Sequence, residues 1–260
     1  MNAGYSLELD ATASEFYRKT MHILTDNGVP FMVGGGHALV QYTGIVRDTK
    51  DFDIFLYQRD CPRALQFMNA AGYKTEMTDA LWIGKAFCRE FYVDFIFGAA
   101  NCVAVVDRQW FDNARHAEIL GVQTSLIPIE EMIWSKAFVM DRDRFDGADI
   151  LHLILRNDKK INWQRLLQRF GEHWQILLLY LLYFQFVYPS EIDRLPKAMM
   201  GELLSRAQAQ LQSAPAREHL CRGPLFSIDQ YAADLSKWGF VNGKQQFIDH
   251  LLHGSGSDVA

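Results

Sequence analysis

Short apolar runs rich in β-branched and aromatic residues are confined to the first half of the chain, and this asymmetry strongly constrains the fold. The runs lie at 31–33, 51–56, 91–97 and 122–127. The segment 62–71, between the second and third runs, has apolar residues at helical spacing. Strands that alternate with helices are typical of an α/β fold. We therefore expect a small mixed sheet flanked by helices.

After Pro128 the pattern becomes helical. Helices are predicted over 130–140, 148–155, 162–170, 173–187, 195–211 and 228–238. No linker rich in Pro, Gly or Ser separates the two parts, so we expect them to share a cleft. The predicted domains are residues 1–157, a mostly helical C-terminal domain over 158–253, and a frayed tail over 254–260.

Composition excludes several classes of protein. The 26 Lys and Arg residues against 31 Asp and Glu give a net charge of -5, which argues against coating nucleic acid by charge alone. The most apolar stretch, 176–184, is far shorter than the roughly 20 residues of a membrane span, so no membrane partner is expected. The four cysteines form no C-x-x-C pair and the first residues lack a signal pattern, which predicts a cytoplasmic protein. The sequence leaves the oligomeric state open.

Three glycines, Gly34, Gly35 and Gly36, lie between an apolar strand-like run and a helical pattern. Backbone N–H groups at such a helix start can bind a phosphate. The alternative is a tight strand-to-helix turn in which glycine is needed only for its backbone freedom.

Asp51 and Asp53 bracket Phe52 in a strand-like run, so both carboxylates point to the same face of the strand. Two carboxylates that are so close repel each other unless a cation or proton lies between them, and oxygen ligands suit Mg²⁺. A solvated edge strand with alternating acids is the alternative. The neighbouring Phe52 and Ile54 weaken it, because they favour an interior strand.

Asp94 lies inside 91–97, a run that otherwise indicates a buried strand. A carboxylate in that position requires a partner. It could form a buried structural ion pair, or it could serve as a third metal ligand or general base. The acids of the run 51–56 favour the second interpretation.

Taken together, these residues resemble a known signature. Gly35 to Ala38, Gly44, Arg47, Thr49 and Asp51 to Asp53 are similar to the G-G-x-A…G…R-x-T-x-D-x-D pattern of polymerase-β-like nucleotidyltransferases. The resemblance covers about residues 28 to 155 and implies the α/β (α+β) nucleotidyltransferase fold.

The same resemblance implies a site. Asp51, Asp53 and Asp94 would be the catalytic carboxylates and would hold Mg²⁺, with two ions expected, and the substrate would be a nucleoside triphosphate. The residues that it places at the nucleotide are Gly34, Gly35, Gly36, His37, Arg47 and Thr49. Gly36 and His37 occupy turn positions where many relatives have Ser or Thr, so the phosphate contact would come from the His37 ring or from the backbone.

The segment 130–150 is similar to abortive-infection-type toxin nucleotidyltransferases of bacteria and their relatives. This similarity implies that Lys136 binds the triphosphate, with Arg142 or Arg144 beside it. It also implies that Asp146 or Asp149 orients the lysine or the nucleotide. The alternatives are a surface lysine on an amphipathic helix and a solvated network of salt bridges.

The implied reaction transfers a nucleoside monophosphate to an acceptor hydroxyl and releases pyrophosphate. The acceptor could be an RNA end such as that of tRNA, a protein, or a small molecule such as an aminoglycoside. Arg165 and Arg169 share a helical face that could receive RNA, whereas a polycationic acceptor would need acids from the helical domain. Candidates for those acids are Glu172, Glu191, Asp193 and Glu202. The alternative function is a catalytically silent module that binds nucleotide or an antitoxin-like partner.

Overall fold

The computed structural model describes residues 10–47, 49 and 51–253. The described residues divide into two compact units, 10–128 together with 247–253 and 129–246. The predicted domain boundary after residue 157 falls inside the second unit. The predicted tail over 254–260 lies outside the described residues.

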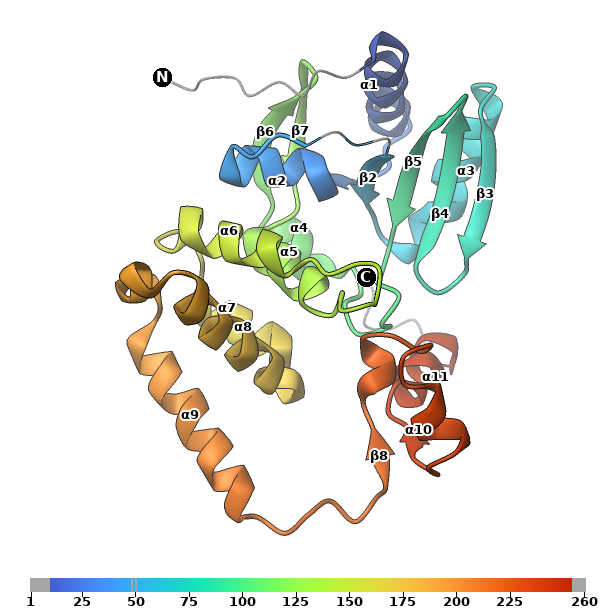
Figure 1. Ribbon diagram of the computed structural model, residues 1–260. Coiled ribbons are helices and arrows are strands. Elements are labelled where there is room, and N and C mark those ends of the chain that lie inside the picture. Colours follow the sequence, from blue (N-terminus) through green and yellow to red (C-terminus); the bar gives the residue numbers. More distant parts are fainter. Residues whose placement is uncertain (1–9, 48, 50, 254–260) are drawn as a thin grey trace. The chain divides into compact units, whose positions relative to one another are not determined.

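A mixed seven-stranded sheet forms the centre of the first unit, in the order β3-β4-β5-β2-β1-β7-β6 (Figure 1). Its strands are β1 (Met32–Val33), β2 (Asp51–Phe55), β3 (Lys74–Asp79), β4 (Ile83–Cys88), β5 (Phe91–Ile96), β6 (Arg115–Ile119) and β7 (Val122–Leu126). The pairs β2/β5 and β1/β7 are parallel, and the other neighbours are antiparallel. The predicted small mixed sheet is confirmed, and it contains three strands, β3, β4 and β6, that the sequence pattern did not indicate.

Helices flank this sheet, as predicted. They are α1 (Ala11–Asp26), α2 (Gly35–Thr43), α3 (Cys61–Ala70) and the short α4 (Arg108–Asp112). The helix α3 packs on β3, β4 and β5 and also against α1 (Figure 1). The ring of Tyr17 on α1 stacks on Phe52 of β2 with centroids 4.8 Å apart, and the ring of His37 on α2 meets Phe52 edge-on at 4.8 Å. One face of β2 is therefore buried under α1 and α2, and its alternating acids face the other way.

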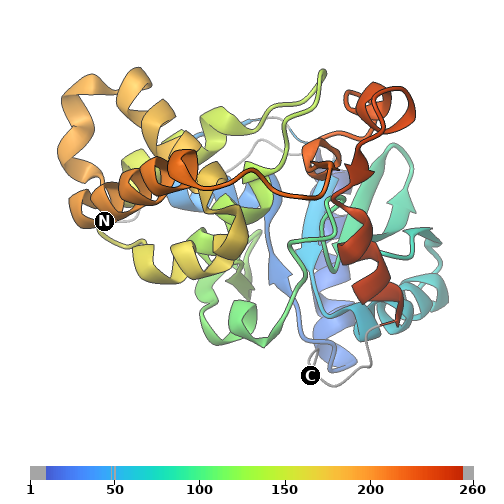
Figure 2. The ribbon, with the colours of Figure 1, turned by 90° about the horizontal axis from the view of Figure 1, so that it is seen from below.

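The second unit is mostly helical, as expected of the C-terminal part. Its helices are α5 (Ile129–Ala137), α6 (Gly147–Asn157), α7 (Trp163–Phe170), α8 (Trp174–Val187), α9 (Lys197–Gln212) and α10 (Ala232–Ser236), and α11 (Gln245–His253) crosses the boundary between the units. A short parallel pair joins β8 (Leu220–Cys221) to β9 (Val241–Asn242). The long helix α9, orange in Figure 2, packs against α8. Among the described residues, no helix has both the length and the hydropathy that a membrane span requires.

The helix predicted over 228–238 is wrong in its extent, because only α10 is helical there. The residues before α10 form turns instead. The Ser227 hydroxyl donates to Asp141 at 3.0 Å, and the Gln230 amide donates to the same carboxylate at 3.3 Å. The Ser227 hydroxyl also accepts a hydrogen bond from the Gln230 backbone N–H at 3.3 Å, and such a local side-chain bond offers this segment an alternative to helical bonding.

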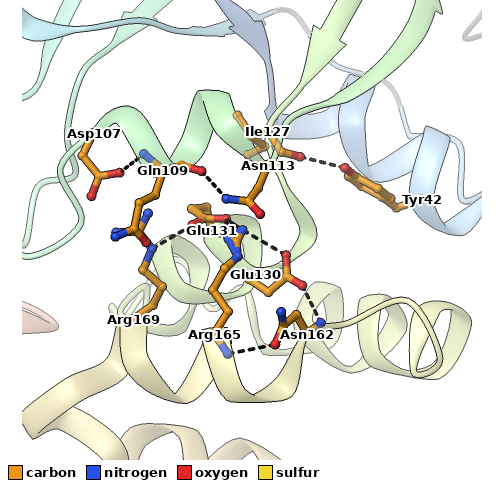
Figure 3. A network of polar contacts seen from close by, with 10 residues as sticks. All are labelled: Tyr42, Asp107, Gln109, Asn113, Ile127, Glu130, Glu131, Asn162, Arg165 and Arg169. Carbon is orange, nitrogen blue, oxygen red and sulfur yellow. Dashed lines mark hydrogen bonds and ion pairs between the residues drawn. The ribbon is translucent and has the colours of Figure 1, made fainter. Parts of the chain in front are cut away.

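Buried ion pairs join α5 to α7 (Figure 3). Glu131 is fully buried and accepts hydrogen bonds from Arg165 Nη1 at 2.8 Å and from Arg169 Nε at 2.8 Å. Glu130 accepts from Arg165 Nη2 at 3.2 Å and from the Asn162 backbone N–H at 2.6 Å. Burial raises the pKa of Glu131, and the two guanidinium groups oppose that shift. Arg165 and Arg169, which could have received RNA, are thus held in the packing of the second unit.

We expect the substitution Glu131→Gln to lower the free energy of unfolding by about 3–5 kcal/mol, because it leaves two buried guanidinium groups without their shared carboxylate. The matched control is Glu202→Gln, which removes an exposed pair with Arg206 one helical turn away and should cost no more than about 1 kcal/mol. Urea denaturation followed by circular dichroism measures both. Equal stability of the two variants would contradict the structural role of Glu131.

Candidate active site

The parallel pairing of β2 with β5 brings three carboxylates together. Asp53 pairs with Asp94 and Asp51 pairs with Tyr92, so the three acids lie on the same face of the sheet. One oxygen from each of Asp51, Asp53 and Asp94 lies within 4.8 Å of the others. We call these three residues the carboxylate cluster. An all-oxygen ligand set of this kind could hold Mg²⁺, and the metal site itself stays a prediction.

The start of α2 lies directly against the carboxylate cluster. The Gly34 N–H donates to the Asp53 carbonyl at 2.9 Å. Gly35 has a φ of +52°, and a Cβ atom at this position would overlap with Asp53 Oδ2. Glycine is therefore required at residue 35 both by its backbone conformation and by its contact with the carboxylate. At Gly36 the nearest atom to such a Cβ is 3.8 Å away, on Thr49.

The remaining residues predicted at the nucleotide differ in their surroundings. The Thr49 hydroxyl donates a hydrogen bond to the Asp51 carboxylate, so it orients a member of the cluster. The side chain of Arg47 is exposed. His37 is buried, with its ring edge-on to Phe52. Burial lowers the pKa of His37 to about 4, although Asp51 opposes the shift, so the imidazole is neutral at pH 7. Roles of these side chains in nucleotide binding remain predictions.

Asp94 has a basic partner that the sequence did not reveal. Lys85 on β4 is its cross-strand neighbour, and Lys85 Nζ donates to Asp94 Oδ1 at 2.6 Å. Burial raises the pKa of Asp94, the hydrogen bond and charge of Lys85 oppose the shift, and Asp51 adds to it. The two interpretations of Asp94 thus meet in one residue, which forms an ion pair and also belongs to the carboxylate cluster. Recognising Lys85 from the sequence would have required the register of β4 on β5.

A second cluster lies in the second unit and contains residues predicted from the similarity of 130–150. Lys136 Nζ lies 2.6 Å from Asp146 Oδ2 and 2.9 Å from Asp149 Oδ2. Arg144 Nε lies 3.1 Å from Asp146 Oδ1, and the side chains of Arg144 and Arg142 are both exposed. Burial acts to raise the pKa of Asp146, but the hydrogen bonds and charges of Arg144 and Lys136 outweigh it and lower the pKa. A network of salt bridges is present, although Lys136, Asp146 and Asp149 are largely buried and not solvated as the alternative interpretation had it. Nucleotide binding by these residues remains a prediction.

The four acids proposed for a polycationic acceptor all have basic partners. The pairs are Glu172 with Arg222, Glu191 with Arg194, Asp193 with Lys197, and Glu202 with Arg206. Three of these pairs are three or four residues apart in the sequence, so the acids are neutralised locally. Their arrangement gives no support to an acidic acceptor surface.

Comparison with known proteins identifies one family. Residues 13–173, more than half of the chain, match the family described as "Nucleotidyl transferase of unknown function (DUF2204)". The matched segment contains both clusters. No curated protein matches the chain.

Several solved structures resemble the chain at low identity. The antibiotic-resistance factor ANT(2'')-Ia is 16% identical, with 65% of this chain and 96% of that chain covered and a TM-score of 0.47. The lincomycin-bound lincosamide antibiotic adenylyltransferase LnuA is 18% identical, with 54% and 94% covered and a TM-score of 0.39. JHP933 from Helicobacter pylori is 14% identical, with 80% and 100% covered and a TM-score of 0.38. At these values the likeness carries no conclusion about a substrate.

The two neighbouring glycines at the start of α2 provide a matched test. Gly35→Ala should lower the free energy of unfolding by at least about 1–2 kcal/mol, because alanine is strained at positive φ and its Cβ displaces the Asp53 carboxylate. Gly36→Ala should leave stability unchanged or slightly higher, because it improves helix propensity without a close contact. Chemical denaturation measures both. A Gly35→Ala variant as stable as Gly36→Ala would contradict the described contact with Asp53.

Buried His37 should make stability depend on pH. Its folded pKa of about 4 lies below the ordinary value of 6.5, so the unfolded chain binds a proton between these values and the folded chain does not. Stability is therefore fully present above pH 6.5 and falls as the pH drops toward 4, by about 3 kcal/mol in total from this group.

Urea denaturation across this pH range measures the loss, and His37→Phe should lack this component. An NMR titration of the imidazole in the native protein is a second measurement. A His37 ring that titrates near pH 6.5 in the folded protein would refute the effect.

Proposed function

The chain belongs to this family of nucleotidyl transferases, and from that premise we propose that it transfers a nucleoside monophosphate from a nucleoside triphosphate to an acceptor hydroxyl and releases pyrophosphate. The observation that carries the proposal is the carboxylate cluster, with Asp51 and Asp53 on β2 and Asp94 on the parallel neighbour β5.

The cluster fits the metal that this chemistry uses. Its donors are all carboxylate oxygens, which suit Mg²⁺, and the half-buried Asp51 and Asp53 remain accessible. Asp51, Asp53 and Asp94 would hold the metal, with two ions expected. When bound, Mg²⁺ neutralises charge on the triphosphate and lowers the pKa of the acceptor hydroxyl.

Protein groups around the cluster have separate tasks in this proposal. The first backbone N–H groups of α2, at Gly35 and Gly36, face the anionic phosphates with the positive end of the helix. The Thr49 hydroxyl keeps the Asp51 carboxylate in one orientation. Asp94 either takes up the proton of the attacking hydroxyl or holds the metal that activates this hydroxyl, and its raised pKa favours the first of these tasks.

The second cluster is assigned to the phosphates on the strength of the sequence similarity. Lys136 would bind the triphosphate together with Arg142 or Arg144, while Asp146 and Asp149 hold the lysine ammonium. A phosphate oxygen would then take the place of a carboxylate oxygen in the coordination of Lys136. The same similarity supports a toxin–antitoxin setting in a bacterium, and the cysteine pattern supports a cytoplasmic location.

Three classes of acceptor are candidates: an RNA end such as that of tRNA, a protein hydroxyl, and a small molecule such as an aminoglycoside. Arg165 and Arg169 are engaged with Glu131 and give no support to the RNA class. The local pairing of the helical-domain acids likewise gives no support to a polycation. A direct assay therefore has to include all three classes.

The deciding assay supplies the purified chain with Mg²⁺, each α-labelled nucleoside triphosphate in turn, and total RNA, cell protein or an aminoglycoside panel. We expect Asp51→Asn and Asp53→Asn to reduce label transfer by at least about 100-fold with the fold retained, because each removes a charged metal ligand. The control is Asp112→Asn, which changes an exposed acid on α4.

Full transfer by the Asp51 or Asp53 variant would overturn the assignment of the carboxylate cluster. Nucleotide binding without transfer to any acceptor would favour the silent binding module. Nucleotide binding is read from thermal stabilisation, since a ligand that binds only the folded chain raises its stability.

A further inference from the structure

Lys85 lies beside the carboxylate cluster in a fixed position. It is on β4, opposite Asp94 of β5 in the antiparallel register, and its Nζ lies 2.6 Å from Asp94 Oδ1. The ammonium also lies 4.4 Å from the centroid of the Tyr92 ring. The side chain of Lys85 is 23% exposed and that of Asp94 is 11% exposed. A carboxylate and an aromatic face thus hold the Lys85 ammonium in place.

This position gives the ammonium two effects on a cation that enters the cluster. It occupies one oxygen of Asp94, so that oxygen is a poorer ligand until the hydrogen bond is broken. It also repels a divalent cation directly, because two positive charges at such short range interact even in a water-like dielectric. At the same time the hydrogen bond from Lys85 holds the Asp94 carboxylate in one orientation. Without this bond the carboxylate would be free to rotate.

We propose that Lys85 is a positioning residue that holds Asp94 and lowers the affinity of the carboxylate cluster for free divalent cations, so that the metal is taken up together with the nucleoside triphosphate. The triphosphate supplies the anionic oxygens that offset the charge of Lys85 when the metal binds. This inference rests on the proposed function and assigns Lys85 a part in it.

The test measures Mn²⁺ binding to the full chain by electron paramagnetic resonance, without nucleotide. Lys85→Met keeps an apolar stem against Tyr92 and removes the charge, so we expect it to bind Mn²⁺ on the order of tenfold more tightly than the original chain. Lys85→Arg keeps the charge and should bind Mn²⁺ like the original chain. Lys74→Met is the matched control, because Lys74 Nζ lies 5.6 Å from the Phe87 ring centroid on the neighbouring strand pair, and it should leave Mn²⁺ affinity unchanged.

A second measurement separates positioning from simple damage to the sheet. In the label-transfer assay at saturating Mg²⁺, Lys85→Met should lower turnover because Asp94 is no longer held, while Lys85→Arg should restore most of it. For Lys85→Met we expect tighter Mn²⁺ binding together with slower turnover. Damage to the sheet would instead lower both the Mn²⁺ affinity and the turnover. Lys85→Gln, which keeps a donor without the charge, serves as a second neutral variant if Lys85→Met does not fold.

The inference is overturned if a folded neutral variant binds Mn²⁺ no more tightly than the original chain. It is also overturned if the original chain binds no Mn²⁺ with or without nucleotide, since the cluster would then not be a cation site. If the expected difference in Mn²⁺ affinity is found but the original chain transfers no label, the proposed reaction fails and the effect of Lys85 on cation affinity stands.

Discussion

The parallel pairing of β2 with β5 places Asp51, Asp53 and Asp94 on one face of the sheet, and much of the first unit accommodates their mutual repulsion. Carboxylates within 4.8 Å of one another are costly unless positive groups or donors approach them. The structure brings the start of α2 to Asp53, the Thr49 hydroxyl to Asp51, and the Lys85 ammonium to Asp94. Each acid therefore lies against a group from another part of the chain, and Asp51 and Asp94 each accept a hydrogen bond from that group.

Solvent access distinguishes Glu131, which holds the fold, from Asp51 and Asp53, which could hold a ligand. Glu131 is fully buried and its oxygens are occupied by two guanidinium groups, so its part is to join α5 to α7. Asp51 and Asp53 are only half-buried, although the strand that carries them is otherwise interior. Two acids on an otherwise interior strand reduce the apolar surface that the strand can bury, but they remain accessible to a ligand. Residues that disagree in this way with the pattern of their element are typical of functional sites.

Sequence reasoning succeeded where the pattern is local. The alternation of Asp51, Phe52 and Asp53 sufficed to place the acids on one face, and the glycines at the start of α2 marked the turn that lies against them. It failed for β3 and β6, because these edge strands are largely exposed and carry polar residues at most positions. It failed for β4 because Gly84 and Lys85 interrupt its apolar pattern, and the partner of Lys85 is set by strand register, a long-range property that periodicity does not contain.

The lysines of the two clusters are both held in ion pairs, and such a pair leaves room for the ligand role proposed for Lys136. Lys85 and Lys136 each have a carboxylate oxygen at 2.6 Å, and both side chains are largely buried. Desolvating an ammonium and fixing a long side chain cost free energy. At Lys85 and Lys136 these costs arise when the chain folds and not when a ligand binds. Exchange of one carboxylate oxygen for a phosphate oxygen at Lys136 then requires only a change of anionic partner. Salt bridges and nucleotide binding are therefore not exclusive at Lys136. The salt bridges would hold the lysine in the position from which it binds a phosphate.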